Sequence, residues 1–160
     1  MSPVGTSPRI IRRILRACIS YQVDFVRTGD LLRSRRMVLE DIENFTTIDS
    51  SVISRATRNV SVISPAGFFT MKASDASLDC PSLFDEGATT IDGHDCSRKA
   101  VLSVIRDLIM GENKSAPYTD EQIVERLSRH GYAVARRTVA KYRELMGVPK
   151  RAARRITVSC

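Results

Sequence analysis

The stretch that decides the fold lies near the end of this 160-residue chain and reads Ala135-Arg136-Arg137-Thr138-Val139-Ala140-Lys141-Tyr142-Arg143-Glu144. Apolar residues recur through it at helical spacing, which predicts a helix over residues 134–146. The face expected to lie against a core carries Ala135, Val139, Tyr142 and Met146. The opposite face carries Arg137, Ala140, Lys141 and Glu144, flanked by Arg136 and Arg143.

This second face is narrow and positively charged, which suits the floor of a DNA major groove. An arginine side chain can donate two hydrogen bonds to the O6 and N7 atoms of guanine, and neighbouring cations can bind phosphates. The alternative interpretation is a charged helix face that only contacts water, because such faces are common. The pattern of this one helix leaves both interpretations open.

Two more helices are expected before this one, over residues 97–110 and 120–130. Ser97 would cap the first of them, and Thr119 with Gln122 forms a capping box at the start of the second. Residues 131–133 then make a three-residue turn into the final helix, as a helix-turn-helix requires. Residues 97–160 are therefore predicted to form a helical DNA-binding domain.

The other end of the chain predicts a second helix-turn-helix. Helices are expected over residues 8–27, 37–45 and 49–58, and the last two are joined by a tight turn. Asp49 or Ser50 would cap the third helix. A turn signal at residues 64–67 predicts a short β-hairpin near residues 62–72. The expected fold class is all-α, with two small helix-turn-helix modules and this one hairpin.

The net charge of +7 is distributed unevenly along the chain. Residues 1–60 carry ten Lys and Arg against six Asp and Glu, residues 61–115 carry five against eight, and residues 116–160 carry ten against four. Two basic ends around an acidic middle suit a polyanion such as DNA contacted at two places, although chance charge drift is the alternative. Residues 73–96 lack periodicity and are expected to be an acidic flexible linker between the domains 1–72 and 97–160.

Other classes of function find little support in the sequence. The cysteines lack metal-ligand spacing, and the stretch Asp92-Gly93-His94-Asp95 has no second cluster to complete a metal site. No apolar run reaches the length of a membrane span, so no membrane partner is expected. An enzyme acting on DNA would need clustered carboxylates on a folded scaffold, whereas here they fall in the expected linker. We therefore expect no catalytic residues, no metal and no cofactor.

Residues 135–144 match, position for position, the signature box of the sigma-54 (RpoN) class of bacterial transcription initiation factors, which the chain resembles. The segment Ala116-Pro117-Tyr118-Thr119-Asp120-Glu121-Gln122-Ile123 resembles the Pro-Leu-Ser-Asp-x-x-Ile stretch before the box in that family. Gly147-Val148-Pro149 and the pair Arg154-Arg155 resemble the segment after it. The resemblance is close over residues 97–155 and looser over residues 8–72.

The looser resemblance covers the first helix-turn-helix. Residues 41–57 align without gaps to the helix-turn-helix that precedes the box domain in the family. The family usually has Leu, Gly, His and Thr where this chain has Thr46, Thr47, Asp49 and Val52. The family's Thr-Pro-x-Gly-x-Phe-x-Leu-Lys motif is similar to Ser64-Pro65-x-Gly67-x-Phe69-x-Met71-Lys72. These losses imply that the DNA contact of this module is weakened or altered. Ser54 and Arg55 are retained as candidate DNA contacts, and Arg55 is the residue still expected to read DNA.

The box domain of the family binds the upstream promoter element, which is marked by a GG pair. The resemblance implies that Arg137 contacts a guanine and that Arg143 lies on a phosphate. Arg136 and Lys141 are the next candidates for the guanine contact. Thr138 and Ala140 complete the DNA-facing set on this helix. The cations that would follow the DNA backbone and give salt-sensitive affinity are Lys150, Arg151, Arg154 and Arg155.

The partners implied by the resemblance are double-stranded promoter DNA and core RNA polymerase, the latter through residues 8–60. The alternative is a polymerase-docking or competitor module whose DNA binding is non-specific. The family's activator-responsive N-terminal region is not in this sequence, so an activator ATPase is not an expected partner. A fragment, a truncated gene product and a natural competitor all fit the sequence. The expected location is the bacterial cytoplasm, at the nucleoid.

Overall fold

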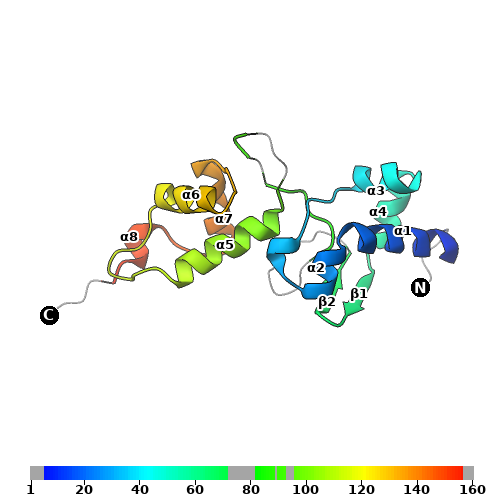
Figure 1. Cartoon of the computed structure of the whole chain (residues 1–160), viewed down its shortest axis with the longest axis horizontal. Coiled ribbons are helices and arrows are strands. Elements are labelled where there is room, and N and C mark those ends of the chain that lie inside the picture. Colours follow the sequence, from blue (N-terminus) through cyan, green and yellow to red (C-terminus); the bar gives the residue numbers. More distant parts are fainter. Residues whose placement is uncertain (1–5, 72–81, 89, 93–95, 157–160) are drawn as a thin grey trace.

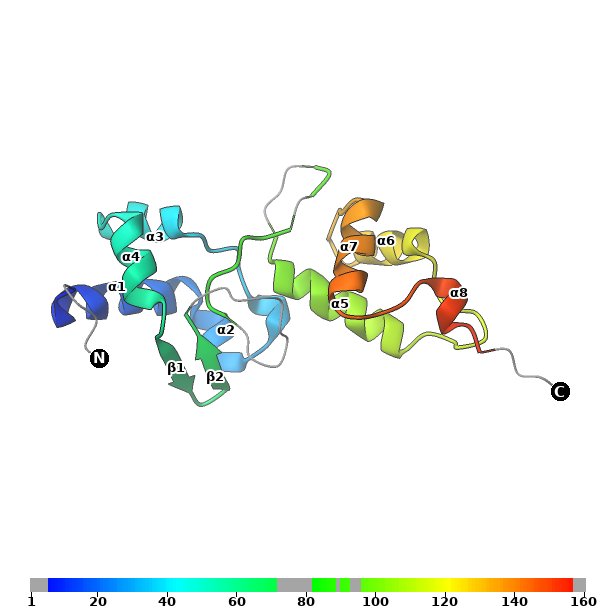
Figure 2. The same cartoon turned by 180° about the vertical axis from the view of Figure 1, so that it is seen from behind.

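The computed structural model describes residues 6–71, 82–88, 90–92 and 96–156. Two helical modules follow one another along the longest axis of the molecule (Figure 1, Figure 2). The first module contains α1 (Pro8–Tyr21), α2 (Val23–Thr28), the 3-10 helix η1 (Leu31–Arg33), α3 (Leu39–Thr46), α4 (Ser50–Thr57), β1 (Ser61–Ser64) and β2 (Gly67–Thr70). The second contains α5 (Arg98–Met110), α6 (Asp120–Arg129), α7 (Arg136–Leu145) and α8 (Arg151–Arg154). The expected fold class is confirmed; neither η1 nor α8 was expected.

Each module has its own hydrophobic core. The first core includes the fully buried residues Ile14, Phe25, Ile42, Ile53 and Met71. The second includes the fully buried residues Val101, Ile105, Ile123, Leu127, Val134 and Val139. Burial of apolar surface is the main force that stabilises such small helical units.

None of the helices in the described parts of the chain is long and apolar enough to cross a membrane.

The single helix expected over residues 8–27 is instead two helices that meet at Gln22. The buried Gln22 amide donates hydrogen bonds to the carbonyl oxygens of Arg35 (2.6 Å) and Leu83 (3.0 Å). Its own oxygen accepts one from the Arg35 N–H (2.9 Å). These bonds satisfy a polar side chain in the interior, which would otherwise cost free energy. Gln22 therefore ties the end of α1 to two distant loops.

The first helix-turn-helix consists of α3, a short turn and α4. Thr47 ends α3 in the left-handed conformation, with φ of 58°, and its N–H donates to the Glu43 carbonyl oxygen at 2.7 Å. Asp49 caps α4, as expected, because its carboxylate accepts the Ser51 N–H at 2.9 Å. The two helices therefore meet at the predicted position.

The predicted hairpin is confirmed and extends from Ser61 to Thr70. β1 and β2 are antiparallel, with Val62 opposite Phe69 and Ser64 opposite Gly67. Phe69 is buried and makes an edge-to-face contact with Phe25, with ring centroids 5.0 Å apart. The hairpin thus covers the core of the first module beside α2.

The second module begins and ends its helices close to the predicted positions. Ser97 caps α5 by accepting the Ala100 N–H at 3.2 Å. Thr119 and Gln122 form the predicted capping box at the start of α6, with bonds of 3.1 and 3.0 Å. α7 begins at Arg136, two residues later than expected, because Val134 forms a β-bridge with Thr90 and is buried in the core.

The prediction of a flexible linker over residues 73–96 is wrong for residues 82–88. Leu83 and Phe84 are buried in the core of the first module, and Asp85 pairs with Met37 in an antiparallel bridge. Ala88 is buried in the core of the second module and pairs with Cys96. Two apolar residues within an acidic stretch gave too short a pattern to predict burial. Residues 73–81, 89 and 93–95 of the expected linker lie outside the described residues.

Candidate nucleic-acid interface

The second helix-turn-helix places α7 with one face buried and one face open. Val139 and Tyr142 are buried, and Ala135 and Met146 are partly buried, as the helical periodicity predicts. The turn before α7 contains Gly131 with φ of 86°, a conformation in which residues with a Cβ are strained. The Tyr132 N–H bonds to the Leu127 carbonyl oxygen at 2.9 Å and closes the end of α6. The core and the turn together fix which face of α7 is presented to solvent.

The open face of α7 carries the predicted DNA-reading residues. Arg136, Arg137 and Lys141 are exposed, and the smaller Thr138 and Ala140 are partly exposed between them. Within the described residues, Arg137 and Lys141 make no ion pair. Arg136 pairs with Glu121 of α6 at 3.0 Å, but both side chains are exposed. An exposed pair of this kind is weak, so the Arg136 guanidinium remains available to another anion.

Arg143 does not belong to this face, which corrects the predicted phosphate contact. The residue is only 1% exposed, and its Nε lies 3.0 Å from the Asp120 carboxylate on α6. Its Nη1 donates to the Val148 carbonyl oxygen at 2.7 Å. A buried guanidinium needs such partners, and at 1% exposure the side chain does not reach the open face of α7. Arg143 therefore joins α7 to the start of α6 and to the segment after α7.

The predicted contact of Arg154 with the DNA backbone is also wrong, because its side chain is used inside the module. Its Nε lies 3.1 Å from the fully buried carboxylate of Glu112, and its Nη2 donates to the Tyr118 carbonyl oxygen at 2.6 Å. The Glu112 carboxylate also accepts the Tyr118 N–H at 2.8 Å. Arg154 thus attaches the short helix α8 to the segment before α6. Lys150, Arg151 and Arg155 are exposed, which their expected contact with the DNA backbone requires.

In the first module the two predicted DNA contacts have different surroundings. Arg55 is exposed on α4 and its Nε donates to the Ser51 carbonyl oxygen at 3.3 Å. Ser54 is partly buried and lines a hollow of about 340 Å³ together with Met37 and Phe84. The Ser51 hydroxyl and N–H bond to the Asp49 carboxylate and hold the pKa of Asp49 below its ordinary value. Arg55 is therefore the more accessible of the two.

Four arginines of α1 form a basic surface, and none of them is among the predicted DNA contacts. Arg9, Arg12, Arg13 and Arg16 line a hollow of about 320 Å³ whose other wall includes Phe45 and Thr46 at the end of α3. Phe45 is 69% exposed. None of the four arginines makes an ion pair with another described residue. Their spacing of three and four residues is the signal that places them on one helix face.

A family model described as the sigma-54 DNA-binding domain matches residues 4–156. The RNA polymerase sigma-54 factor of Vibrio anguillarum is 32% identical over 136 residues, and that of Escherichia coli strain K12 is 34% identical over 137. These matches cover 85% and 86% of this chain but 26% and 27% of the relatives, so the chain spans about a quarter of their length.

A structural comparison gives the same result. The crystal structure of Aquifex aeolicus sigmaN bound to promoter DNA matches with a TM-score of 0.64 and 28% sequence identity. The match covers 92% of this chain and 41% of that one. It therefore includes both helical modules rather than the signature box alone.

Proposed function

Because this chain belongs to the sigma-54 family through its DNA-binding domain, we propose that it binds double-stranded promoter DNA in a sequence-specific manner. The observation that carries the proposal is the open face of α7, where Arg137 and Lys141 are exposed on a helix held by a packed core. The element it reads is the upstream one, marked by a GG pair, as the resemblance of the box implies. The proposed function is binding alone, at the bacterial nucleoid, with no catalytic step and no cofactor.

The proposal gives the basic residues different roles. Arg137 donates to a guanine, while Arg136 and Lys141 contact the neighbouring bases or phosphates. The short side chains of Thr138 and Ala140 let the helix backbone approach the groove. Lys150, Arg151 and Arg155 bind phosphates, and Arg55 with Ser54 contacts a second element through α4. Arg143 and Arg154 hold the module together and are left out of the interface.

Fluorescence anisotropy on two short duplexes tests the role of Arg137. One duplex carries the GG pair and the other has it replaced, and each is titrated with the wild-type chain and with Arg137→Ala. The substitution should cost about 1–3 kcal/mol on the GG duplex, roughly tenfold to a hundredfold in affinity, and much less on the other. Equal losses on both duplexes would show that Arg137 does not read bases.

Lys150→Ala is the matched control, because Lys150 is an exposed cation outside α7. This substitution should weaken binding to both duplexes alike and reduce the dependence of affinity on salt concentration. If Lys150→Ala instead lowered affinity only on the GG duplex, the division between base-reading and phosphate-binding residues would be wrong.

A second candidate function is docking on core RNA polymerase through residues 8–60. The exposed Phe45 beside the four arginines of α1 favours it, since an aromatic side chain among cations is typical of protein interfaces. Co-purification with core polymerase tests this function. Charge reversal at Arg12 and Arg16 should abolish co-purification while the preference for the GG duplex over the duplex without GG is kept. Retention of co-purification by this variant would exclude the surface.

A further inference from the structure

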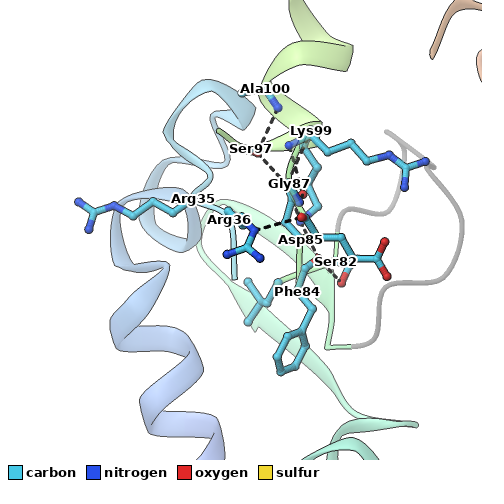
Figure 3. A network of polar contacts seen from close by, with 12 residues as sticks. Arg35, Arg36, Ser82, Phe84, Asp85, Gly87, Ser97, Lys99 and Ala100 are labelled. Carbon is cyan, nitrogen blue, oxygen red and sulfur yellow. Dashed lines mark hydrogen bonds and ion pairs between the residues drawn. The ribbon is translucent and has the colours of Figure 1, made fainter. Parts of the chain in front are cut away.

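Asp85 links the two modules beside the packing of α5 on η1, and its backbone belongs to the first module (Figure 3). The Asp85 N–H donates to the Met37 carbonyl oxygen and the Met37 N–H donates to the Asp85 carbonyl oxygen, both at 2.9 Å. Leu83 and Phe84, directly before it, are buried in the first core. Asp85 therefore moves with the first module, close to the start of α3.

The carboxylate of Asp85 points away from the first module, to the start of α5. One oxygen accepts the Arg98 N–H at 3.1 Å, and the other accepts the Lys99 N–H at 3.3 Å and the Ser97 hydroxyl at 2.7 Å. The first N–H groups of a helix lack partners within it and carry a partial positive charge. The side chain is 1% exposed, so these bonds form away from water. Asp85 thus caps a helix that belongs to the other module.

The first turn of α5 is also held on both sides by cationic side chains. The Lys99 Nζ donates to the Phe84 carbonyl oxygen at 3.0 Å and lies 5.7 Å from the centre of the Phe25 ring, which attaches it to the first module. The Arg98 guanidinium lies 5.5 Å from the centre of the Tyr142 ring on α7. Contacts therefore run without a break from the first core, through Asp85 and the start of α5, to the helix that carries Arg137.

We propose that Asp85 is a positioning residue that holds the two helix-turn-helix modules at a fixed separation and orientation, so that both engage one duplex only when its two elements have the matching spacing. The inference rests on the proposed function, because it needs both modules to bind DNA. Linking two binding units raises affinity only when the link lets both engage at once. Each added base pair moves an element by about 3.4 Å and turns it by about 35°, since one DNA turn is 10–10.5 base pairs and about 34–36 Å. A joint with this many hydrogen bonds keeps the two modules from moving and rotating to match a changed spacing of the elements.

Asp85→Asn tests the inference with a change of little more than charge. The amide keeps the shape of the side chain but replaces one accepting oxygen with an NH2 group, which faces donors and cannot accept their hydrogen bonds. Glu86→Gln is the matched control, because it removes the same charge one residue further on from an exposed side chain. The full chain is used in every case.

Binding is measured on duplexes that carry both elements at spacings stepped by single base pairs, and on duplexes that carry one element alone. The affinity of the wild type and of Glu86→Gln should fall at least tenfold two base pairs away from the best spacing. The affinity of Asp85→Asn should fall less than threefold over the same range, with affinity for single elements unchanged. A flat spacing profile in the wild type, or a steep profile kept by Asp85→Asn, would overturn the inference. Failure of the wild type to prefer the GG duplex would instead reject the proposed function.

Nitrogen-15 relaxation of the free chain gives an independent readout that does not depend on DNA. The amide groups of both modules should report one rotational correlation time in the wild type and in Glu86→Gln. In Asp85→Asn the two modules should report different and shorter times while each keeps its native chemical shifts. Separate tumbling of the modules in the wild type would overturn the inference, even if Asp85→Asn failed to fold.

Discussion

Arg137 and Arg143 carry the same guanidinium group on the same helix, yet the fold gives them opposite surroundings. Arg137 lies in solvent, whereas Arg143 is buried between the Asp120 carboxylate and the Val148 carbonyl oxygen. The difference follows from their positions around α7, because six residues correspond to about 600° of helical rotation, or about 240° after one full turn. The same residue type is therefore open to a ligand at one position and stabilises the module at the other.

Arg143→Ala should lower the free energy of unfolding by about 3 kcal/mol, because it leaves the Asp120 carboxylate and the Val148 carbonyl oxygen without their charged partner. Arg137→Ala is the control and should change this free energy by less than about 0.5 kcal/mol, since it is an exposed side chain without a partner among the described residues. Urea unfolding of the two variants makes the comparison. If Arg143→Ala were as stable as the wild type but bound DNA more weakly, its assignment to the interior would be wrong.

Thr47 is a position where this sequence is less stable than it need be. It adopts the left-handed conformation, which costs a residue with a Cβ about 1–2 kcal/mol. Thr47→Gly should raise the stability by about 0.5–1 kcal/mol, because relief of strain exceeds the entropy that glycine adds to the unfolded chain. Thermal unfolding measures the effect. Asn44→Gly, in the helical part of α3, should lower the stability; a decrease in both variants would refute the strain argument.

At the scale of the helix, local rules predicted most of what the structure shows. The caps at Asp49, Ser97 and Thr119 and the buried positions Val139 and Tyr142 were expected because each depends on residues within one or two turns. The break between α1 and α2 was missed because the Gln22 amide bonds to Leu83, 61 residues away. A periodic pattern holds no information about such distant partners.

The candidate interface follows the same division between local and distant contacts. Arg136, Arg137 and Lys141 were placed correctly on the open face because helical rotation alone decides that face. Arg143 and Arg154 were misplaced because their partners, Asp120 and Glu112, come from other elements. A basic residue in a DNA-binding sequence is expected on DNA by default, and only the packing of the module shows which ones are used internally.

Helix α5 carries a pH-dependent contribution to stability at Lys99. Burial lowers the pKa of Lys99 from 10.5 to about 8, although the neighbouring Asp85 carboxylate opposes the shift. Between pH 8 and 10.5 the folded chain has released this proton while the unfolded chain still holds it. Unfolding then takes up a proton, so this residue makes the folded state more stable as the pH rises through that range.

Lys99→Met should abolish that increase, because Met cannot titrate and fits a buried site. Urea unfolding of the wild type and the variant at about pH 7.5, 8.5 and 9.5 measures the slopes. Burial also raises the pKa values of Tyr132 and Tyr142. Both tyrosines are present in the two proteins, so subtracting one pH slope of the unfolding free energy from the other removes their contribution. Identical slopes in the two proteins would show that the Lys99 ammonium is not buried in this way.

At the scale of the whole molecule, basic surfaces occur on both modules and an internal acidic residue joins them. The four arginines of α1 lie in the first module, and the open face of α7 lies in the second. If DNA binds both, Arg12→Gln with Arg16→Gln should reduce the slope of log affinity against log salt by about 0.9 for each phosphate that the variant no longer neutralises. Arg27→Gln, on the exposed surface of α2, is the control and should leave the slope unchanged. Equal slopes in all three proteins would remove α1 from the DNA interface.

The burial of Arg143 has a consequence for genetics. A reporter screen for mutants that fail to bind DNA would recover changes at both Arg137 and Arg143, since loss of the DNA contact that we propose for Arg137 and depletion of folded protein give the same colony phenotype. The two groups of mutants would separate at a lower growth temperature. A destabilised Arg143 variant regains folded protein in the cold, whereas an Arg137 variant still lacks the side chain that makes the contact. The signature box would therefore appear uniformly intolerant in a screen at one temperature and divide into two classes of allele at another.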